Sequence, residues 1–272
     1  TMITHQQAPQ RRIGVESSHG FGDCLFNAPL LKAISEQFGV TVGVATQPQN
    51  ADAFHNLPWV DEIITIKSMR DGEHKFRELG YQKTYQATQN VWFYEFRQAN
   101  PHLSLIDTAA AVGKHFGIND FNQQPIFIPT KEESNTHNSI GGGPIIAIES
   151  VYNSAQSWAA ESDFNYIIEK YGKSHRILWL SHKGHPNHPN LIQTKHLSRR
   201  QLIACLHRVE TFFSVGSGFF CALLSLPPHL QPKRTVCLWT DNLYLYESRL
   251  RDVNWCSTIT WVHNHVELRG IQ

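Results

Sequence analysis

The sequence predicts an α/β protein of two Rossmann-like domains. Short β-branched segments alternate with helical ones along all 272 residues, and twice a strand runs into a glycine-containing turn, at 17–23 and at 216–218. A polar stretch at 131–143 separates two such series and is expected to be a linker. We therefore expect an N-terminal domain at 1–135 and a C-terminal domain at 136–272.

The first series opens with a strand at Arg12–Glu16, and a helix over Leu25–Phe38 follows the glycine loop, with apolar residues at helical spacing. Val40–Ala45 is short and β-branched, which is typical of a buried parallel strand. Gly117 is expected to end the last helix of this half as a C-cap glycine. The remaining elements are expected as a short helix, two strands and a helix, at 52–57, 62–66, 85–89 and 105–116.

The second series repeats the same alternation after residue 144. Its strands are expected at 145–148, 176–180, 211–215 and 236–239, with the last of them closing the sheet. Its helices are expected at 163–171, 198–207 and 219–226. Strands that alternate with helices in this way predict a parallel sheet in each domain.

Composition excludes several classes of protein. The 24 Lys and Arg nearly balance the 23 Asp and Glu, so the net charge of +1 gives no sign of a polyanionic partner. Five cysteines without a CxxC pair argue against a disulfide framework or a structural zinc site. Apolar runs fall short of the roughly 20 residues of a membrane span, and the polar start of the chain lacks the apolar core of a signal peptide. We expect a cytoplasmic monomer without a transmembrane segment.

Five segments, in order, resemble the glycosyltransferase family 9, the heptosyltransferases of lipopolysaccharide core assembly. They are Gly22-Asp23 with PLLKAI at 29–34, NLPWVDEI at 56–63, the stretch 101–118, NSAQSWAAESDF at 153–164, and 197–226 with its Ser217-Gly218. The resemblance implies a GT-B fold, in which the two Rossmann-like domains face each other across a cleft, with the acceptor on the N-terminal domain and the nucleotide-sugar donor on the C-terminal one. The departures lie on the donor side. Gln156, Gly216 and Cys221 stand where the family usually has a basic residue, an acid and a histidine.

The activity implied by this resemblance is inverting transfer of a sugar from a nucleotide-diphosphate sugar to a hydroxyl acceptor. A saccharide or glycolipid of lipopolysaccharide type is the expected acceptor, and the enzyme is expected to need no metal and no other cofactor. One alternative keeps the enzyme class but takes a hydroxymethylated base in DNA as acceptor, although DNA binding draws on clustered Lys and Arg. A second alternative is a non-catalytic nucleotide-sugar-binding protein.

Glycosyl transfer needs a base that takes the proton from the acceptor hydroxyl. Asp23 is the predicted base, because it follows the first strand at the edge where open α/β sheets bind ligands. The alternative is that Asp23 caps the following helix. His19 is a second catalytic candidate, and Glu16 could also act as the base. The acceptor loop is expected to comprise Ser18, Gly20 and Gly22, whose glycines let a substrate approach the backbone.

The leaving diphosphate needs an anion site, which we expect at Gly216, Ser217 and Gly218. A strand, a glycine turn and a helix together present backbone N–H groups and the positive end of a helix dipole to a phosphate. The alternative is a tight turn whose glycines serve packing alone. Ser150, Ser154, Gln156, Trp158 and Lys183 are expected to line the facing side of the donor site. Lys183 would supply the positive charge that Gln156 lacks, unless it is an ordinary surface lysine.

The histidines are a rival signal, because imidazoles are common metal ligands. Two clusters stand out, His182, His185 and His188 in one and His263 and His265 in the other. Pro186 and Pro189 prevent a helix that would present the first cluster on one face. We therefore interpret these histidines as surface loop residues and predict no metal site.

Overall fold

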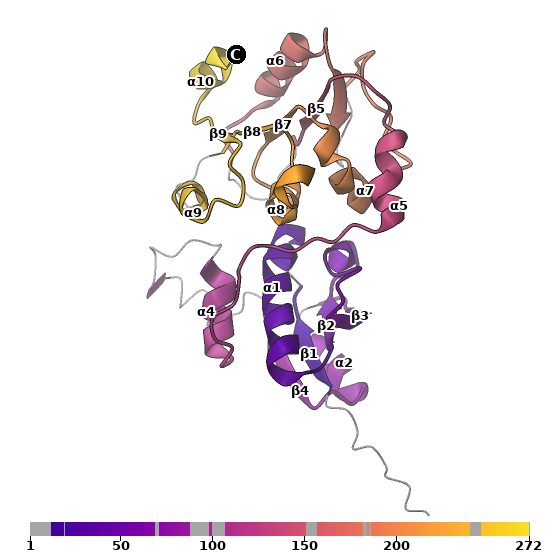
Figure 1. The fold of residues 1–272 in the computed structure, drawn as a ribbon, viewed down its shortest axis with the longest axis vertical. Helices are drawn as coiled ribbons and strands as arrows, with labels where there is room; N and C mark the ends of the chain where they lie inside the picture. The colour runs from indigo at the N-terminus through magenta and orange to yellow at the C-terminus, as the bar shows by residue number, and fades with distance from the viewer. Residues whose placement is uncertain are drawn as a thin grey trace, which may run out of the picture. The chain divides into compact units, whose positions relative to one another are not determined.

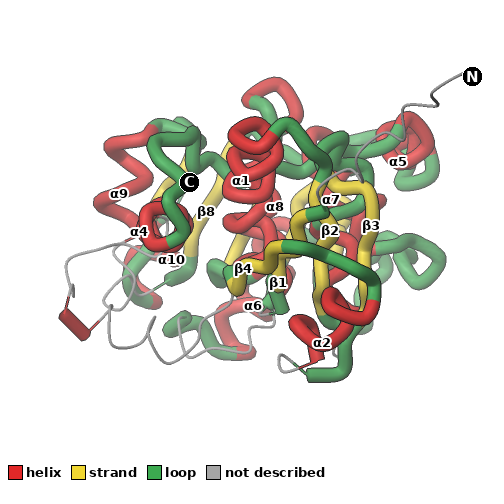
Figure 2. Tube along the Cα trace, turned by 90° about the horizontal axis from the view of Figure 1, so that it is seen from below, coloured by secondary structure: helices red, strands yellow, loops and turns green. Residues whose placement is uncertain are grey.

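The computed structural model describes residues 12–18, 20–68, 71–87, 98–99, 107–150, 157–181, 184, 186–239 and 246–271. The chain divides into two compact units. Unit 1 comprises Thr1–Pro101 and Ala109–Gln123, and unit 2 comprises His102–Thr108 and Gln124–Gln272. Each unit has its own sheet, flanked by helices (Figures 1 and 2). Within the described residues, every helix is too short or too polar to span a bilayer.

Unit 1 contains a four-stranded parallel sheet in the order β3-β2-β1-β4. Its strands are β1 (Ile13–Glu16), β2 (Val42–Thr46), β3 (Val60–Thr65) and β4 (Lys83–Gln86). Its helices are α1 (Phe21–Phe38), the 3-10 helix η1 (Pro48–Ala53), α2 (Asp71–Glu78) and α4 (Thr108–His115). The two central strands, β1 and β2, are buried along their whole length.

Glycines in the central strands set how closely α2 packs on this sheet. A Cβ atom on Gly14 would lie 2.5 Å from the ring of Phe76, and one on Gly43 would lie 2.1 Å from the hydroxyl of Tyr81. The side chains that replace the missing Cβ atoms therefore come from α2 and the turn after it. Because side chains alternate along a strand, Glu16 shares the Gly14 face of β1 and points to the same side as α2.

Unit 2 contains a five-stranded parallel sheet in the order β6-β5-β7-β8-β9. Its strands are β5 (Ile145–Ile148), β6 (Arg176–Trp179), β7 (Thr211–Ser214), β8 (Arg234–Cys237) and β9 (Ile259–Trp261). Its helices are α5 (Lys131–Asn135), α6 (Glu161–Tyr171), α7 (Arg199–Ala204), α8 (Gly218–Ser225), α9 (Tyr246–Val253) and α10 (His265–Gly270), with 3-10 turns η3 (Thr136–Asn138), η4 (Leu206–Arg208) and η5 (Pro228–Leu230). The apolar faces of α6 and α10 pack on this sheet around Phe164, Phe213 and Leu268.

The prediction of α/β architecture with strands near the expected positions is confirmed, but several elements differ, and α9 and α10 were not expected. The helix expected from Leu25 already begins at Phe21, which places Gly22 and Asp23 in its first turn instead of in a loop. The helix expected at 52–57 is the 3-10 turn η1, and α2 was not predicted. The sheet of unit 2 also continues past the strand that was expected to close it, with β9 as a fifth strand. Gly117 has φ of +75°, as expected for a C-cap glycine.

The expected linker at 131–143 instead begins with α5, which a capping box stabilises. The Thr130 hydroxyl accepts the Glu133 N–H at 3.1 Å, and the Glu133 carboxylate accepts the Thr130 N–H at 2.8 Å. Arg200, which is buried, donates to the same carboxylate at 2.6 Å. This ion pair attaches α5 to α7, so the segment belongs to unit 2, and the division between the units falls after Gln123 instead of after residue 135.

Candidate functional site

The strand order of each sheet reverses beside its first strand. In unit 1 the chain moves from β1 to β2 and β3 on one side and returns to β4 on the other, and in unit 2 it moves from β5 to β6 and returns to β7. Open α/β sheets bind ligands beyond the carboxyl ends of the strands at such a switch point. A glutamate stands at both points, Glu16 as the last residue of β1 and Glu149 directly after β5. Each unit therefore has one candidate site.

In unit 1, Glu16 is held at the carboxyl edge of the sheet by close contacts. It lies opposite Gln86 in the register of β1 and β4, and its side chain is only 3% exposed. The Ser18 hydroxyl donates to its carboxylate at 2.5 Å. A Cβ atom on Gly72 would lie 2.8 Å from the Glu16 Cγ atom, so the first turn of α2 approaches this side chain closely. The carboxylate is thereby fixed between a strand end and a helix start.

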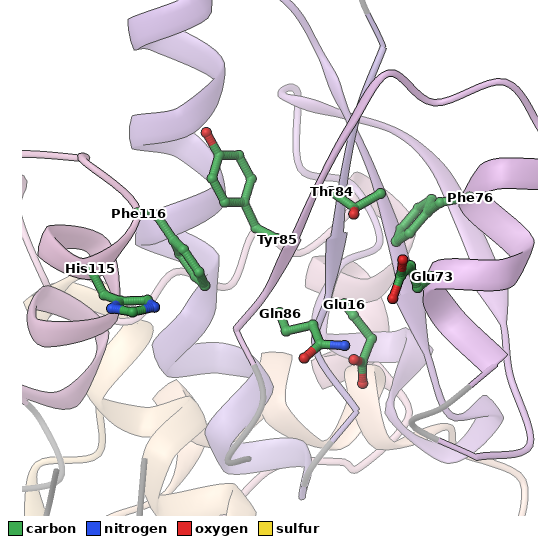
Figure 3. A pocket seen from close by; sticks show the side chains of 8 residues that line it. All are labelled: Glu16, Glu73, Phe76, Thr84, Tyr85, Gln86, His115 and Phe116. Atoms are coloured by element: carbon green, nitrogen blue, oxygen red, sulfur yellow. The ribbon is translucent and has the colours of Figure 1, made fainter. Parts of the chain in front are cut away.

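A cavity of about 410 Å³ borders this carboxylate (Figure 3). Its volume falls in the range of small-molecule sites. Figure 3 shows Glu16 and Gln86 next to each other, with the rings of Tyr85 and Phe116 on the other side of β4. The described residues that line it are Glu16, Glu73, Phe76, Thr84, Tyr85, Gln86, His115 and Phe116. Aromatic rings beside amide and carboxylate groups form a lining suited to a polyhydroxylated ring.

Asp23, the predicted base, lies in the first turn of α1 and is partly exposed. The N-cap residue of this helix is Gly20, so Asp23 is not the N-cap that the alternative interpretation assumed. A Cβ atom on Gly20 would lie 3.1 Å from the Asp23 Oδ2 atom, which shows that the carboxylate folds back over this glycine. A negative charge in the first turn is also stabilised by the helix dipole.

The connection from β1 to α1 is held in place by buried polar groups. The Asn27 amide donates to the Ser17 hydroxyl at 2.9 Å and to the Ala87 carbonyl at 3.3 Å. The Ser17 N–H donates to the Ala45 carbonyl at 2.9 Å. These bonds join the ends of β1, β2 and β4 to the first turns of α1. Ser17 and Asn27 are therefore fixed at the strand ends, and Ser18 is turned toward Glu16.

In unit 2, Glu149 occupies the point at which we expected a phosphate. Its side chain is fully buried and accepts bonds from the Ser214 hydroxyl at 2.5 Å, from the Ser217 hydroxyl, and from the Phe219 N–H at 3.0 Å. Burial raises the pKa of this carboxyl above its usual range, although the hydrogen-bond donors of Ser214, Ser217 and Phe219 oppose the shift. The start of α8 thus already holds an acidic group of the protein itself, which binds one of the N–H groups expected to face a diphosphate.

In the turn at 216–218, packing explains the glycine at position 216. Gly216 has φ of +74°, and a Cβ atom on it would lie 2.6 Å from the ring of Trp239. Ser217 is the N-cap of α8 and Gly218 is its first residue. The left-handed backbone and the tryptophan explain Gly216 without a ligand, whereas a donor-binding role for Ser217 and Gly218 stays a prediction.

Comparison with known proteins identifies the fold. No family model matches the sequence, and no curated protein matches it. Among solved structures, a family 9 glycosyltransferase of Veillonella parvula superposes with a TM-score of 0.67 at 12% identity, covering 95% of this chain and 88% of that one. The fold is that of the family 9 glycosyltransferases.

Two heptosyltransferase structures also superpose on this chain. The ADP-heptose lipopolysaccharide heptosyltransferase II of E. coli superposes with a TM-score of 0.62 at 13% identity, covering 93% of this chain and 90% of that one. The E. coli heptosyltransferase WaaC, solved with ADP, gives 0.55 at 13% identity, covering 83% and 86%. The family 9 fold therefore extends over both units, as the sequence resemblance predicted.

The other residues expected on the donor side are only partly described. Ser150 is half-buried directly after Glu149, and Trp158 packs against the unit 2 core while its indole N–H donates to the Val262 carbonyl at 2.7 Å. Ser154, Gln156 and Lys183 lie outside the described residues, as does His19 in unit 1. Their predicted roles stay predictions.

The three described histidines of the two sequence clusters each contact a different residue. His263 lies 3.3 Å from Glu247, His265 lies 2.6 Å from Asp163, and His188 accepts the Asn190 N–H at 3.2 Å. His182 and His185 are outside the described residues. In the part of the chain that is described, no three His, Cys, Asp or Glu side chains are grouped so that they could hold a metal ion. The five cysteines are free and buried.

Sequence reasoning missed two features of unit 2, Glu149 and the contact between His265 and Asp163. The signal for Glu149 was present, because both first strands end in the same pattern, an apolar segment followed by Glu and Ser at 16–17 and 149–150. No local signal announces the second feature, because its two residues are 102 positions apart.

Proposed function

We propose that this protein is an inverting glycosyltransferase that moves a sugar from a nucleotide-diphosphate sugar to a hydroxyl group of a saccharide acceptor of lipopolysaccharide type. The observation that carries the proposal is the likeness to family 9 structures across 95% of the chain, which includes both units. The proposal includes the GT-B arrangement, in which the two units face each other across a cleft, and a reaction that needs no metal. Similar proteins from E. coli are described with ADP and as acting with ADP-heptose, so ADP-heptose is the first donor to test.

In the proposed reaction, unit 1 binds the acceptor and unit 2 binds the donor. The acceptor hydroxyl gives its proton to the Asp23 carboxylate while its oxygen bonds to the anomeric carbon of the donor sugar. The bond from that carbon to the diphosphate oxygen breaks, and the diphosphate leaves with the electron pair. Attack opposite to the leaving group inverts the anomeric carbon. Asp23 fits this role because it is partly exposed in the first turn of the helix that follows β1, at the carboxyl edge of the sheet.

The experiment that tests the proposal replaces Asp23 by Asn and measures sugar transfer and donor binding separately. The wild type is first screened with ADP-heptose and with UDP-, GDP- and dTDP-sugars, by thermal shift and then by release of the nucleoside diphosphate. We expect the Asp23→Asn variant to lose about 10²–10⁴-fold in kcat, the usual contribution of a general base, while its donor affinity stays within about twofold.

Asp71→Asn is the matched control, because Asp71 also lies in the first turn of a helix that follows a strand of the same sheet, where it accepts the Ser68 N–H at 2.9 Å. This variant should keep its turnover. Wild-type turnover in Asp23→Asn would remove Asp23 from the mechanism. Donor binding by the wild type without any transfer would favour the nucleotide-sugar-binding alternative.

A further inference from the structure

His265 and Asp163 form a hydrogen-bonded pair that joins the last helix of the chain to α6. The Nδ1 atom of His265 lies 2.6 Å from Asp163 Oδ1, and Asp163 Oδ2 accepts the Ala160 N–H at 2.8 Å. The Asp163 side chain is 1% exposed, whereas the His265 side chain is 53% exposed. Because an ionised carboxylate only accepts hydrogen bonds, Nδ1 carries the hydrogen of this pair. The Nε2 atom is then the ring nitrogen that remains for a ligand.

The pair lies at the edge of the sheet where ligands bind. Asp163 is in the first turn of α6, which follows β5, and His265 begins α10, which follows β9. Both helix starts therefore lie beyond carboxyl ends of parallel strands. The ring of Trp158 packs edge-on to His265 at 4.9 Å between centroids, and its indole N–H is tied to the Val262 carbonyl. The imidazole is thus fixed on one side by a buried carboxylate and on another by an anchored indole.

Attachment of α10 does not depend on this pair alone. The Tyr166 hydroxyl donates to the Arg269 carbonyl at 3.3 Å, and the Lys170 ammonium donates to the Ile271 carbonyl, so two more side chains of α6 hold α10. Both of these contacts use backbone carbonyls, which any residue could supply. A fully buried carboxylate that orients a half-exposed imidazole is more than the docking of a short helix requires.

A second histidine–acid pair at the opposite edge of the same sheet provides an internal comparison. His175 Nε2 lies 3.2 Å from Glu210 Oε2, and these residues directly precede β6 and β7, at the amino ends of the strands. Here the histidine is 20% exposed and the acid 39%, the reverse of the pair at the carboxyl edge. The exposed imidazole therefore belongs to the edge at which a donor would bind.

A diphosphate at this edge needs positively polarised groups, and the start of α8 supplies fewer than its sequence suggests, because Glu149 already binds the Phe219 N–H there. We propose that His265, oriented by Asp163 and flanked by Trp158, binds a phosphate of the nucleotide-sugar donor as the imidazolium, with its Nδ1–H group donating to Asp163 and its Nε2–H group donating to a phosphate oxygen. The inference rests on the proposed function. It makes His265 a donor-binding residue and Asp163 a positioning residue.

The test compares ADP with adenosine, because only ADP carries the phosphates. Calorimetric titration of both into the wild type and into His265→Ala should show ADP binding weakened by at least about tenfold and adenosine binding unchanged. Asp163→Asn should weaken ADP binding by a smaller factor, because the imidazole stays but its orientation is lost. His265→Lys, which restores a cation, should recover part of the ADP affinity. His175→Ala is the matched control and should bind both ligands like the wild type.

Equal losses for ADP and adenosine in His265→Ala, or no loss for either, would overturn the inference, because a phosphate contact must act on ADP alone. Thermal melting identifies variants that fail to fold. If His265→Ala fails to fold, ADP and adenosine binding are measured in His265→Gln instead, because its amide can still donate to Asp163. A wild type that binds neither ADP nor any other nucleoside diphosphate would overturn the proposed function itself, and this separates the two failures.

Discussion

Glu16 and Glu149 occupy equivalent positions in the two sheets, yet their surroundings differ. Each follows an apolar first strand, precedes a serine and stands at a switch point. Glu149 is fully enclosed and binds two hydroxyls and the N–H of Phe219 at the start of α8. Glu16 is nearly buried too, but it borders a cavity of about 410 Å³. The same local pattern therefore has two outcomes. The Glu149 carboxyl binds the start of α8, and the Glu16 carboxyl forms part of a cavity wall.

The largest expected difference between the units is in the free energy of unfolding that is lost when Glu149 or Glu16 is replaced by Ala. Glu149→Ala leaves the buried Ser214 hydroxyl, the partly buried Ser217 hydroxyl and the Phe219 N–H without their acceptor. We expect it to lower the free energy of unfolding by about 3 kcal/mol. Glu16→Ala should cost about 1 kcal/mol, because water from the adjoining cavity can replace the carboxylate. Urea denaturation of both variants measures the difference. Equal losses would show that the cavity does not distinguish the two sites.

The next largest difference is expected between Gly216, which lies before α8, and Gly20, which lies before α1, when each is replaced by Ala. Gly216→Ala forces a side chain into a left-handed backbone and against the Trp239 ring, so we expect a loss of about 2 kcal/mol in the free energy of unfolding. Gly20 has φ of −58°, which any residue adopts, and Gly20→Ala should change stability by less than about 0.5 kcal/mol.

The added methyl group of Gly20→Ala would instead press on the Asp23 carboxylate, which lies 3.1 Å from that position. If Asp23 is the base, this variant should lose turnover while its melting temperature is kept. Thermal melts and transfer assays on the same preparations check both expectations. A strongly destabilised Gly20→Ala variant would contradict this contrast between the two turns.

The last contrast concerns the pH dependence of stability. Burial raises the pKa of Glu149 in the folded protein above its ordinary value of 4.5. At pH values between the pKa of the unfolded chain and that of the folded protein, the folded protein therefore binds more protons than the unfolded chain. The free energy of unfolding that Glu149 contributes therefore falls as the pH rises through this window. Glu149→Gln lacks this titration, so the stability of the wild type relative to Glu149→Gln should decrease from about pH 5 to about pH 8. Urea denaturation at both values measures it, and an opposite trend would show that the hydrogen-bond donors outweigh burial.

The sequence placed Asp23 after the first strand, and its role as the base stays a prediction. Its helix begins earlier than expected, because Gly20 acts as the N-cap. The capping box of Thr130 and Glu133 was also visible as a Thr-x-x-Glu pattern, and it would have replaced the expected linker by α5. These errors concern local signals whose weight was misjudged.

The sequence by itself determined the α/β class, the positions of most strands and the family 9 resemblance, because buried strands and amphipathic helices repeat at fixed local periods. Only the tertiary structure decided that Glu149 meets the start of α8, that β9 extends the second sheet, and that His265 meets Asp163. Those contacts join residues far apart in the chain, and they depend on which strands become neighbours and which helix starts share an edge. Local periodicity does not predict which strands become neighbours, because the packing of the whole sheet determines it.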